Sequence, residues 1–406
     1  MDLIKIRKPT GYDRDISLLT ASMFVRRIVM GFLQIVRAIY FAYLGYSPVK
    51  IGILLSIATA VSAIHNVTFG YLCDKFGRKP FLILGGIFAT LRMVIFAVTQ
   101  DFWLLALGQG LGALGEGVGA GQPVVSGYIT DKVDARDRPG VYSGMAITNS
   151  LAATIGSALG GLPIYLEASR GYNIITAHQI LWQISAVISA SSLIFILFIQ
   201  ESIRKTEEID IIKVEKPRDW GPILKFSLIR GSNGLAWGIA DSLTPLYFFY
   251  RFDVGTESLG PVYALARFLS IFSYLLIPRI VERFGDINTI IASRLSSAVL
   301  TFLMALTDSY FIAFIILVIN RLVTLFSMPI RQTFASSIVE PDETATAIGI
   351  SSFARMGVQT IAPTLAGYMF ELLSLTTPFI VGSMLMAING GLYWNYFAKD
   401  KKSLKI

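Results

Sequence analysis

Arginine side chains recur deep inside the long apolar stretches of this sequence. They are Arg26, Arg27, Arg37, Arg92, Arg230, Arg267, Arg294, Arg321 and Arg355, and two acids, Glu116 and Asp241, lie in similar surroundings. A charged side chain is costly in a lipid-embedded segment, so such residues face a protein interior and usually serve a function. The guanidinium group stays charged without water and binds a carboxylate or phosphate through two parallel hydrogen bonds. The pattern therefore indicates a site for an anionic solute.

Six of these arginines are the predicted substrate-binding residues, chosen because they lie away from the ends of the apolar stretches or share a helix face. They are Arg26, Arg27, Arg37, Arg267, Arg321 and Arg355. Arg26 and Arg37 are separated by about three helical turns and so lie on one face of a helix. Arg230 and Arg294 lie nearer the segment ends and are not included. The alternative is structural: the arginines bind backbone carbonyls or pair with Glu116 and Asp241.

The two intramembrane acids are the predicted proton-coupling residues. Glu116 lies midway along a glycine-rich segment, and Asp241 lies in the first apolar segment of the second half. A carboxyl group shielded from water can take up and release a proton during a transport cycle. The alternative for each acid is a permanent ion pair with a nearby arginine.

The elements that position these residues are predicted to be transmembrane helices. Of the 406 residues, 54% are hydrophobic and 15% are charged, and the mean hydropathy is +0.62. Soluble domains carry about 25% charged residues. About twelve apolar stretches reach the roughly 20 residues that a spanning helix needs. Helices are expected because each satisfies its own backbone hydrogen bonds in lipid. The fold class is therefore an all-α, multi-pass integral protein of the cell membrane.

The twelve predicted segments fall into two groups of six. They cover residues 16–44, 49–73, 80–100, 102–130, 140–166, 178–200, 222–250, 257–279, 287–307, 309–335, 344–372 and 377–398. Residues 1–200 form the first predicted half, the polar stretch 201–220 is a cytoplasmic linker, and residues 221–406 form the second half. Similar short stretches recur in both halves, for example Ile39–Tyr43 and Leu246–Tyr250. The halves are therefore predicted to be pseudo-symmetric repeats.

Basic residues are distributed unevenly between the two sides of the predicted membrane segments. With the N-terminus inside, the external loops hold only Lys50, Arg170 and Arg251. Lysine and arginine accumulate on the cytoplasmic side of membrane proteins. Both termini are therefore predicted to be cytoplasmic, and the net charge of +8 needs no nucleic-acid partner.

Several other classes of protein lack support in the sequence. Cys73 is the lone cysteine and there are two histidines, so no metal cluster or cofactor is predicted. The phosphate-binding loop of ATP-driven proteins does not occur. A membrane enzyme would need a nucleophile with its base, and no such pair stands out. A sensor would need an output domain, and no sizeable polar region is present.

The most informative loop is the charged turn Gly70-Tyr-Leu-Cys-Asp-Lys-Phe-Gly-Arg-Lys-Pro80, which joins two apolar stretches. Its spacing resembles the signature loop between the second and third helices of the major facilitator superfamily. The resemblance implies a twelve-helix secondary transporter that works by alternating access, moves a small molecule and is not an enzyme. Protons are the expected coupling ion and the bilayer the expected surroundings, and we expect a monomer.

The same resemblance implies a conformational latch around the charged turn. Carried over, Asp74 would meet the start of the helix near Thr344, Arg78 would pair with Asp131, and Arg138 would join the network. The predicted latch residues are Gly70, Asp74, Gly77, Arg78, Lys79, Asp131 and Arg138.

The alternative function is proton-coupled multidrug efflux. The drug–proton antiporter branch of the family carries one signature on the fourth helix and another on the fifth. The run Gln109–Gly112 matches the first, but Ala106 stands at its arginine position. The run Gly156–Gly161 matches the second except that Ser157 replaces proline. These departures weaken the efflux alternative and leave it open. The leading prediction, argued from the arginines, is a small organic solute or an anion such as a carboxylate, phosphate ester or phosphate.

Overall fold

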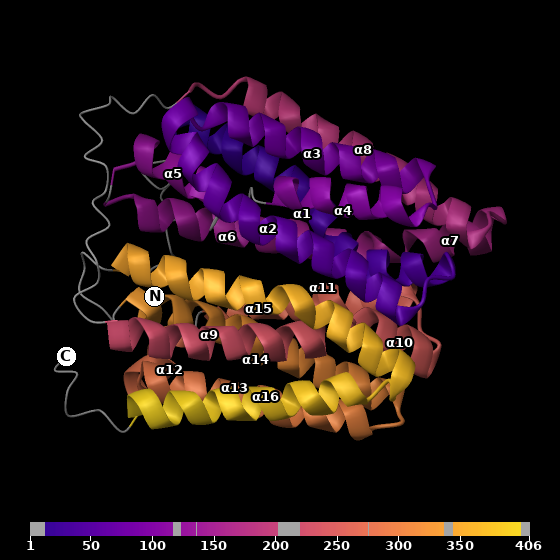
Figure 1. The fold of residues 1–406 in the computed structure, drawn as a ribbon. Coiled ribbons are helices and arrows are strands. Elements are labelled where there is room, and N and C mark those ends of the chain that lie inside the picture. The colour runs from indigo at the N-terminus through magenta and orange to yellow at the C-terminus, as the bar shows by residue number, and fades with distance from the viewer. Residues whose placement is uncertain are drawn as a thin grey trace, which may run out of the picture. The chain divides into compact units, whose positions relative to one another are not determined.

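The computed structural model describes residues 13–116, 123–134, 136–201, 220–274, 276–336 and 344–398. These residues form helices and no strand (Figure 1). Contacts between backbone segments group the chain into two compact units. The first comprises Met1–Leu33 and Ile64–Glu208, and the second comprises Gln34–Ala63 and Ile209–Ile406. The end of the first helix and the beginning of the second therefore belong to the second unit.

The first unit is built on parts of α1 (Arg14–Tyr43) and α2 (Pro48–Phe76). It also contains α3 (Lys79–Val98), α4 (Phe102–Glu116), α5 (Pro123–Lys132), α6 (Arg138–Ala158), the 3₁₀ turn Leu159–Gly161, α7 (Leu162–Arg170) and α8 (Ile174–Leu197). Helices α3 and α8 lie side by side, and Gly86 leaves the space that Leu193 fills (Figure 1). Small residues allow such close approach where lipid offers no hydrophobic drive for association.

The second unit contains α9 (Trp220–Asp241), α10 (Thr244–Phe252), α11 (Thr256–Tyr274), α12 (Ile277–Phe284), α13 (Asp286–Leu306), α14 (Tyr310–Ser336), α15 (Thr344–Leu372), α16 (Thr377–Tyr393) and the π-helical turn Trp394–Ala398. Helix α9 packs along α15, and α13 packs along α16 (Figure 1). An aromatic core that includes Phe226, Phe334 and Tyr393 joins α9, α14 and α16.

Helix occupies every one of the twelve predicted apolar segments. By length and composition, seven described stretches could cross a membrane: Arg14–Tyr43, Pro48–His65, Lys79–Val98, Gly140–Arg170, Ile174–Leu197, Asp286–Leu306 and Tyr310–Arg331. Large apolar side chains such as Trp103, Val187 and Leu306 are exposed, as lipid contact requires. The all-α membrane prediction is confirmed. The predicted linker, residues 201–220, lies outside the described residues apart from Glu201 and Trp220.

Candidate functional site

A cluster of charged and aromatic side chains surrounds Arg321 in the second unit. Its guanidinium forms an ion pair with Asp241 and donates a 2.9 Å hydrogen bond to the Tyr263 hydroxyl. It also lies over the rings of Tyr263 and Trp237, 4.9 and 5.5 Å from their centroids. Aromatic faces attract a cation, and the attraction grows where water is scarce. The cluster therefore joins α9, α11 and α14 through one arginine.

Asp241 occupies the last position of α9 because Pro245 follows four residues later. A proline ring clashes with the carbonyl of the fourth residue before it and cannot donate a backbone hydrogen bond, so the helix breaks there. A carboxylate at a helix C-terminus faces the negative end of the helix dipole. Arg321 compensates for this unfavourable placement. The sequence left open a structural alternative in which an arginine pairs with Asp241. In the structure Arg321 forms this pair.

Two other predicted substrate arginines of the second unit donate hydrogen bonds to side-chain amides. Arg267 lies one turn after Tyr263 on α11 and donates a 2.7 Å hydrogen bond to Gln34 Oε1. Arg355 donates to Gln359 Oε1, one turn away on α15, at 3.1 Å. Arg37 is half-buried on α1. An amide oxygen can give up a guanidinium to a carboxylate without leaving a buried charge unpaired.

The arginines of the first unit differ from one another in exposure. Arg26 is buried and donates to the carbonyl oxygens of Gly115 and Gly85, in α4 and α3. Arg27, its neighbour on α1, is exposed. Carbonyl binding is the structural role that the sequence left open for this group. Glu116 ends α4, and its side chain lies outside the described residues, so its predicted role in proton coupling stays a prediction.

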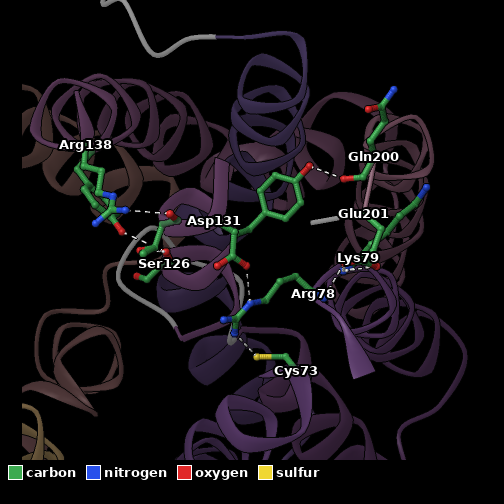
Figure 2. A network of polar contacts seen from close by, with 11 residues as sticks. Cys73, Arg78, Lys79, Ser126, Asp131, Arg138, Gln200 and Glu201 are labelled. Carbon is green, nitrogen blue, oxygen red and sulfur yellow. Dashed lines mark hydrogen bonds and ion pairs between the residues drawn. The ribbon is translucent and has the colours of Figure 1, made fainter. Parts of the chain in front are cut away.

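The charged turn between α2 and α3 forms a separate network in the first unit (Figure 2). Arg78 Nε lies 3.2 Å from Asp131 Oδ2, and the two side chains are 9% and 10% exposed. A second guanidinium nitrogen donates to Cys73 Sγ at 2.7 Å. Gly127 makes this arrangement possible, because a Cβ atom there would clash with Arg78 Cζ. The sequence predicts the arginine–aspartate contact but gives no reason to single out Gly127.

Glu201 is a member of this network that the sequence assigns to the linker. Its carboxylate accepts hydrogen bonds from the backbone N–H groups of Arg78, at 2.8 Å, and of Lys79, at 3.2 Å (Figure 2). It thereby caps the start of α3, where the helix dipole favours a negative charge. Gly77, with a φ of +90°, adopts the left-handed conformation that glycine tolerates best. A Cβ atom at Gly77 would also lie 2.9 Å from the Glu201 carboxyl carbon.

Arg138 and Lys79 bind the ends of helices. Arg138 donates to the carbonyl oxygens of Thr130 and Val133, both at 2.9 Å, where α5 ends (Figure 2). Lys79 Nζ donates to Leu197 O, at the end of α8, at 2.8 Å. Cations are favourable near helix C-termini. The side chains of Asp74 and Thr344 and the surroundings of Gly70 lie outside the described residues, so this part of the latch stays a prediction.

Comparison with protein families identifies a match over most of the chain. A model described as Major Facilitator Superfamily matches residues 18–356 and, in a second match, residues 279–405. Multidrug resistance protein 1 of Bacillus subtilis is 23% identical over 382 residues, which cover 92% of this chain and 94% of that protein. The uncharacterized membrane protein YJR124C of Saccharomyces cerevisiae is 19% identical over 395 residues, with 87% of each chain covered.

A solved structure has a similar fold. The nucleoside transporter NupG superimposes with a TM-score of 0.70 at 15% sequence identity. The superposition covers 94% of this chain and 98% of that chain. The similarity concerns the arrangement of the helices and carries no information on the solute.

Proposed function

Because the chain belongs to the Major Facilitator Superfamily and is a multi-pass membrane transporter, we propose that it moves a small organic anion by proton-coupled alternating access. The observation that carries this proposal is the ion pair of Asp241 and Arg321, with Tyr263 as the third partner. The side chains of Arg321 and Asp241 are 16% and 27% exposed, so neither member of the pair is completely buried.

The proposed coupling follows from competition for one guanidinium. While Asp241 is ionised, it occupies Arg321 and the site has little net charge. When Asp241 takes up a proton, the ion pair is lost, and Arg321 keeps its positive charge because an arginine does not deprotonate in proteins. The exposed charge then favours a carboxylate or phosphate group of the solute. Proton and anion would therefore enter the site together, as in a symporter.

Tyr263 and Trp237 stabilise the guanidinium of Arg321 when Asp241 is protonated. Their rings lie about as close to Arg321 as cation–π attraction requires, so the arginine stays oriented without its carboxylate partner. Arg267, one turn along α11 from Tyr263, is the second proposed contact for the solute. The Gln34 amide, which accepts a hydrogen bond from Arg267, is neutral and can be displaced.

The proposal is tested in proteoliposomes that contain the full chain and a panel of radiolabelled mono- and dicarboxylates and phosphate esters. We expect an imposed proton gradient to drive accumulation of at least one anion by the wild type. Asp241→Asn should keep exchange of labelled for unlabelled solute but lose accumulation, because the site no longer responds to protons. Asp308→Asn is the matched control, since that aspartate is exposed and pairs with Arg251.

Two results would contradict the proposal. One is accumulation by Asp241→Asn at the wild-type level, which would exclude this carboxyl group from coupling. The other is exchange of no anion in the panel, which would remove the proposed solute class while leaving the transporter fold intact.

Multidrug efflux is a second candidate, favoured by the name of the Bacillus subtilis relative and by the Gln109–Gly112 run. It predicts exchange of a hydrophobic cation such as tetraphenylphosphonium and no exchange of anions. The same proteoliposomes separate the two functions, because a site that presents Arg321 and Arg267 should repel such a cation.

A further inference from the structure

A second group of arginines lies in the second unit, and the Asp241–Arg321 pair is not part of it. Arg230 belongs to α9, Arg331 to α14 and Arg355 to α15, and each is half-buried. Neither Arg230 nor Arg331 is a predicted substrate residue. Helix α9 packs along α15, and Gly234, one turn after Arg230, leaves room for Arg355, since a Cβ there would lie 3.1 Å from Arg355 Cγ.

The partners of these three guanidinium groups are neutral. Arg230 donates to Ser351 Oγ at 3.2 Å, and Ser351 lies one turn before Arg355 on α15. Arg331 donates to the carbonyl oxygens of Ser327 and Thr324, at 3.2 and 3.5 Å. Arg355 Nε is buried without a hydrogen-bond partner. Within the part of the chain that the structure describes, none of the three arginines forms an ion pair with a carboxylate.

Two of the arginines lie beside the aromatic core of the second unit. The Arg230 guanidinium lies 5.6 Å from the centre of the Phe226 ring. Phe226 contacts Phe334, which follows Arg331 by less than one turn of α14. Tyr393 of α16 packs against Phe334, with 6.1 Å between the ring centroids. Arg355 approaches the other two from α15, and the three positive charges repel one another.

Three like charges that lie close together in a partly desolvated place repel one another, and this is costly unless a counter-charge binds. Each guanidinium offers five N–H donors in a fixed plane, and the contacts above use only one or two of them. An oxyanion would neutralise the charges and accept hydrogen bonds from the remaining N–H groups. Carboxylates and phosphates suit this geometry because they accept two parallel hydrogen bonds from one guanidinium.

We propose that Arg230, Arg331 and Arg355 form a binding site for an oxyanion with two negative charges, of the phosphate or dicarboxylate type. That the ligand of this site is the transported solute rests on the proposed function. That the site binds an oxyanion does not, and binding alone tests it. All three arginines belong to the second unit, so the first unit contributes no residue to the proposed site. The solute would bind here by its more strongly charged end.

The test measures thermal unfolding of the purified full-length protein in a neutral detergent, with phosphate or chloride at equal ionic strength. Inorganic phosphate should raise the melting temperature, because a ligand that binds the folded state stabilises it. Replacing any one of the three arginines with glutamine should weaken phosphate binding by about tenfold or more, since each removes charge-assisted hydrogen bonds. Arg279→Gln, at an exposed position of α12, is the control and should bind phosphate like the wild type.

A second series and a second ligand keep the test decisive. The lysine variants keep the charge but lose the planar fork, so Arg230→Lys, Arg331→Lys and Arg355→Lys should bind more weakly than wild type and more tightly than the glutamine variants. Mixed micelles with phosphatidic acid, whose headgroup is a phosphate monoester, compared with phosphatidylcholine, show whether a lipid headgroup supplies the oxyanion. Stabilisation by either source that the three substitutions abolish supports the site.

The inference is overturned if neither phosphate nor phosphatidic acid stabilises the protein, or if the arginine variants respond like Arg279→Gln. Failure of the proposed function is recognised separately. Asp241→Asn should bind phosphate at this site like the wild type. Proton-driven accumulation that persists in Asp241→Asn would refute only the coupling, and phosphate binding without exchange of any anion would refute only the transport of anions.

Discussion

Buried charges in this protein are stabilised in three different ways at the level of single residues. Arg26 binds backbone carbonyls, Arg321 binds a carboxylate and two aromatic rings, and Arg78 binds Asp131 together with the Cys73 sulfur. A carbonyl partner cannot change its charge, whereas a carboxylate partner can be protonated. The pairing of Arg321 with Asp241 therefore suits a role that changes during the transport cycle.

Breaking the ion pair of Arg78 and Asp131 tests the predicted latch. Asp131→Asn leaves a nearly buried guanidinium without its counter-charge, and removal of one partner of a buried pair costs about 3–5 kcal/mol. We expect a clearly lower melting temperature and slower solute exchange, with the affinity for phosphate unchanged. Asp134→Asn, at an exposed position three residues later, is the control. A melting temperature equal to that of the control would show that the pair contributes little.

At the level of elements, glycines decide how closely α1 and α6 approach each other. A Cβ atom at Gly156 would clash with Ile28 O, and one at Gly31 would lie 2.6 Å from Ala153 O. Ser157 Oγ donates to Gly31 O across the same contact at 3.2 Å. The antiporter signature has proline where Ser157 lies. A proline side chain cannot donate a hydrogen bond, whereas the Ser157 hydroxyl links α6 to α1. The departure from the signature thus has a structural consequence.

This contact predicts a large difference between two alanine substitutions. Gly156→Ala places a methyl group against backbone atoms of α1 that cannot move independently, and overpacking of this kind costs about 1–3 kcal/mol. Gly357→Ala, within α15, meets nothing within 4 Å and should be neutral or stabilising by up to about 1 kcal/mol. Thermal unfolding of the two variants side by side measures the difference. Equal melting temperatures would mean that α1 and α6 separate without cost.

At the level of the whole molecule, the distribution of lysine and arginine predicts which loops face the cytoplasm. The loop between α5 and α6 should lie inside and the loop between α15 and α16 outside. A Cys73→Ser background removes the lone cysteine, and the serine hydroxyl can still accept the hydrogen bond from Arg78. Single cysteines are then introduced at two exposed positions, as Asp134→Cys and Ser374→Cys.

A membrane-impermeant maleimide applied to intact cells should label the Ser374→Cys protein. The Asp134→Cys protein should react only after the membrane is permeabilised, and the Cys73→Ser background should not react in either case. The reverse pattern would place both termini outside and contradict the predicted orientation.

The sequence by itself determined the fold class and the family. The length of the apolar segments and the need to satisfy backbone hydrogen bonds in lipid are local properties, so the helices follow from composition alone. The charged turn is likewise contiguous, and its spacing indicated the superfamily that the comparisons then confirmed. The contact between Arg78 and Asp131 was predictable only through this resemblance.

The partners of the buried arginines were decided by the tertiary structure alone. Asp241, Tyr263 and Arg321 are far apart in sequence and meet because Pro245 ends α9 and because α9, α11 and α14 present particular faces to one another. The grouping of Arg230, Arg331 and Arg355 and the capping of α3 by Glu201 arise in the same way. Composition and spacing reveal that a charge lies within a helix. Only the rotation and packing of the helices decide which other charge, ring or carbonyl it meets.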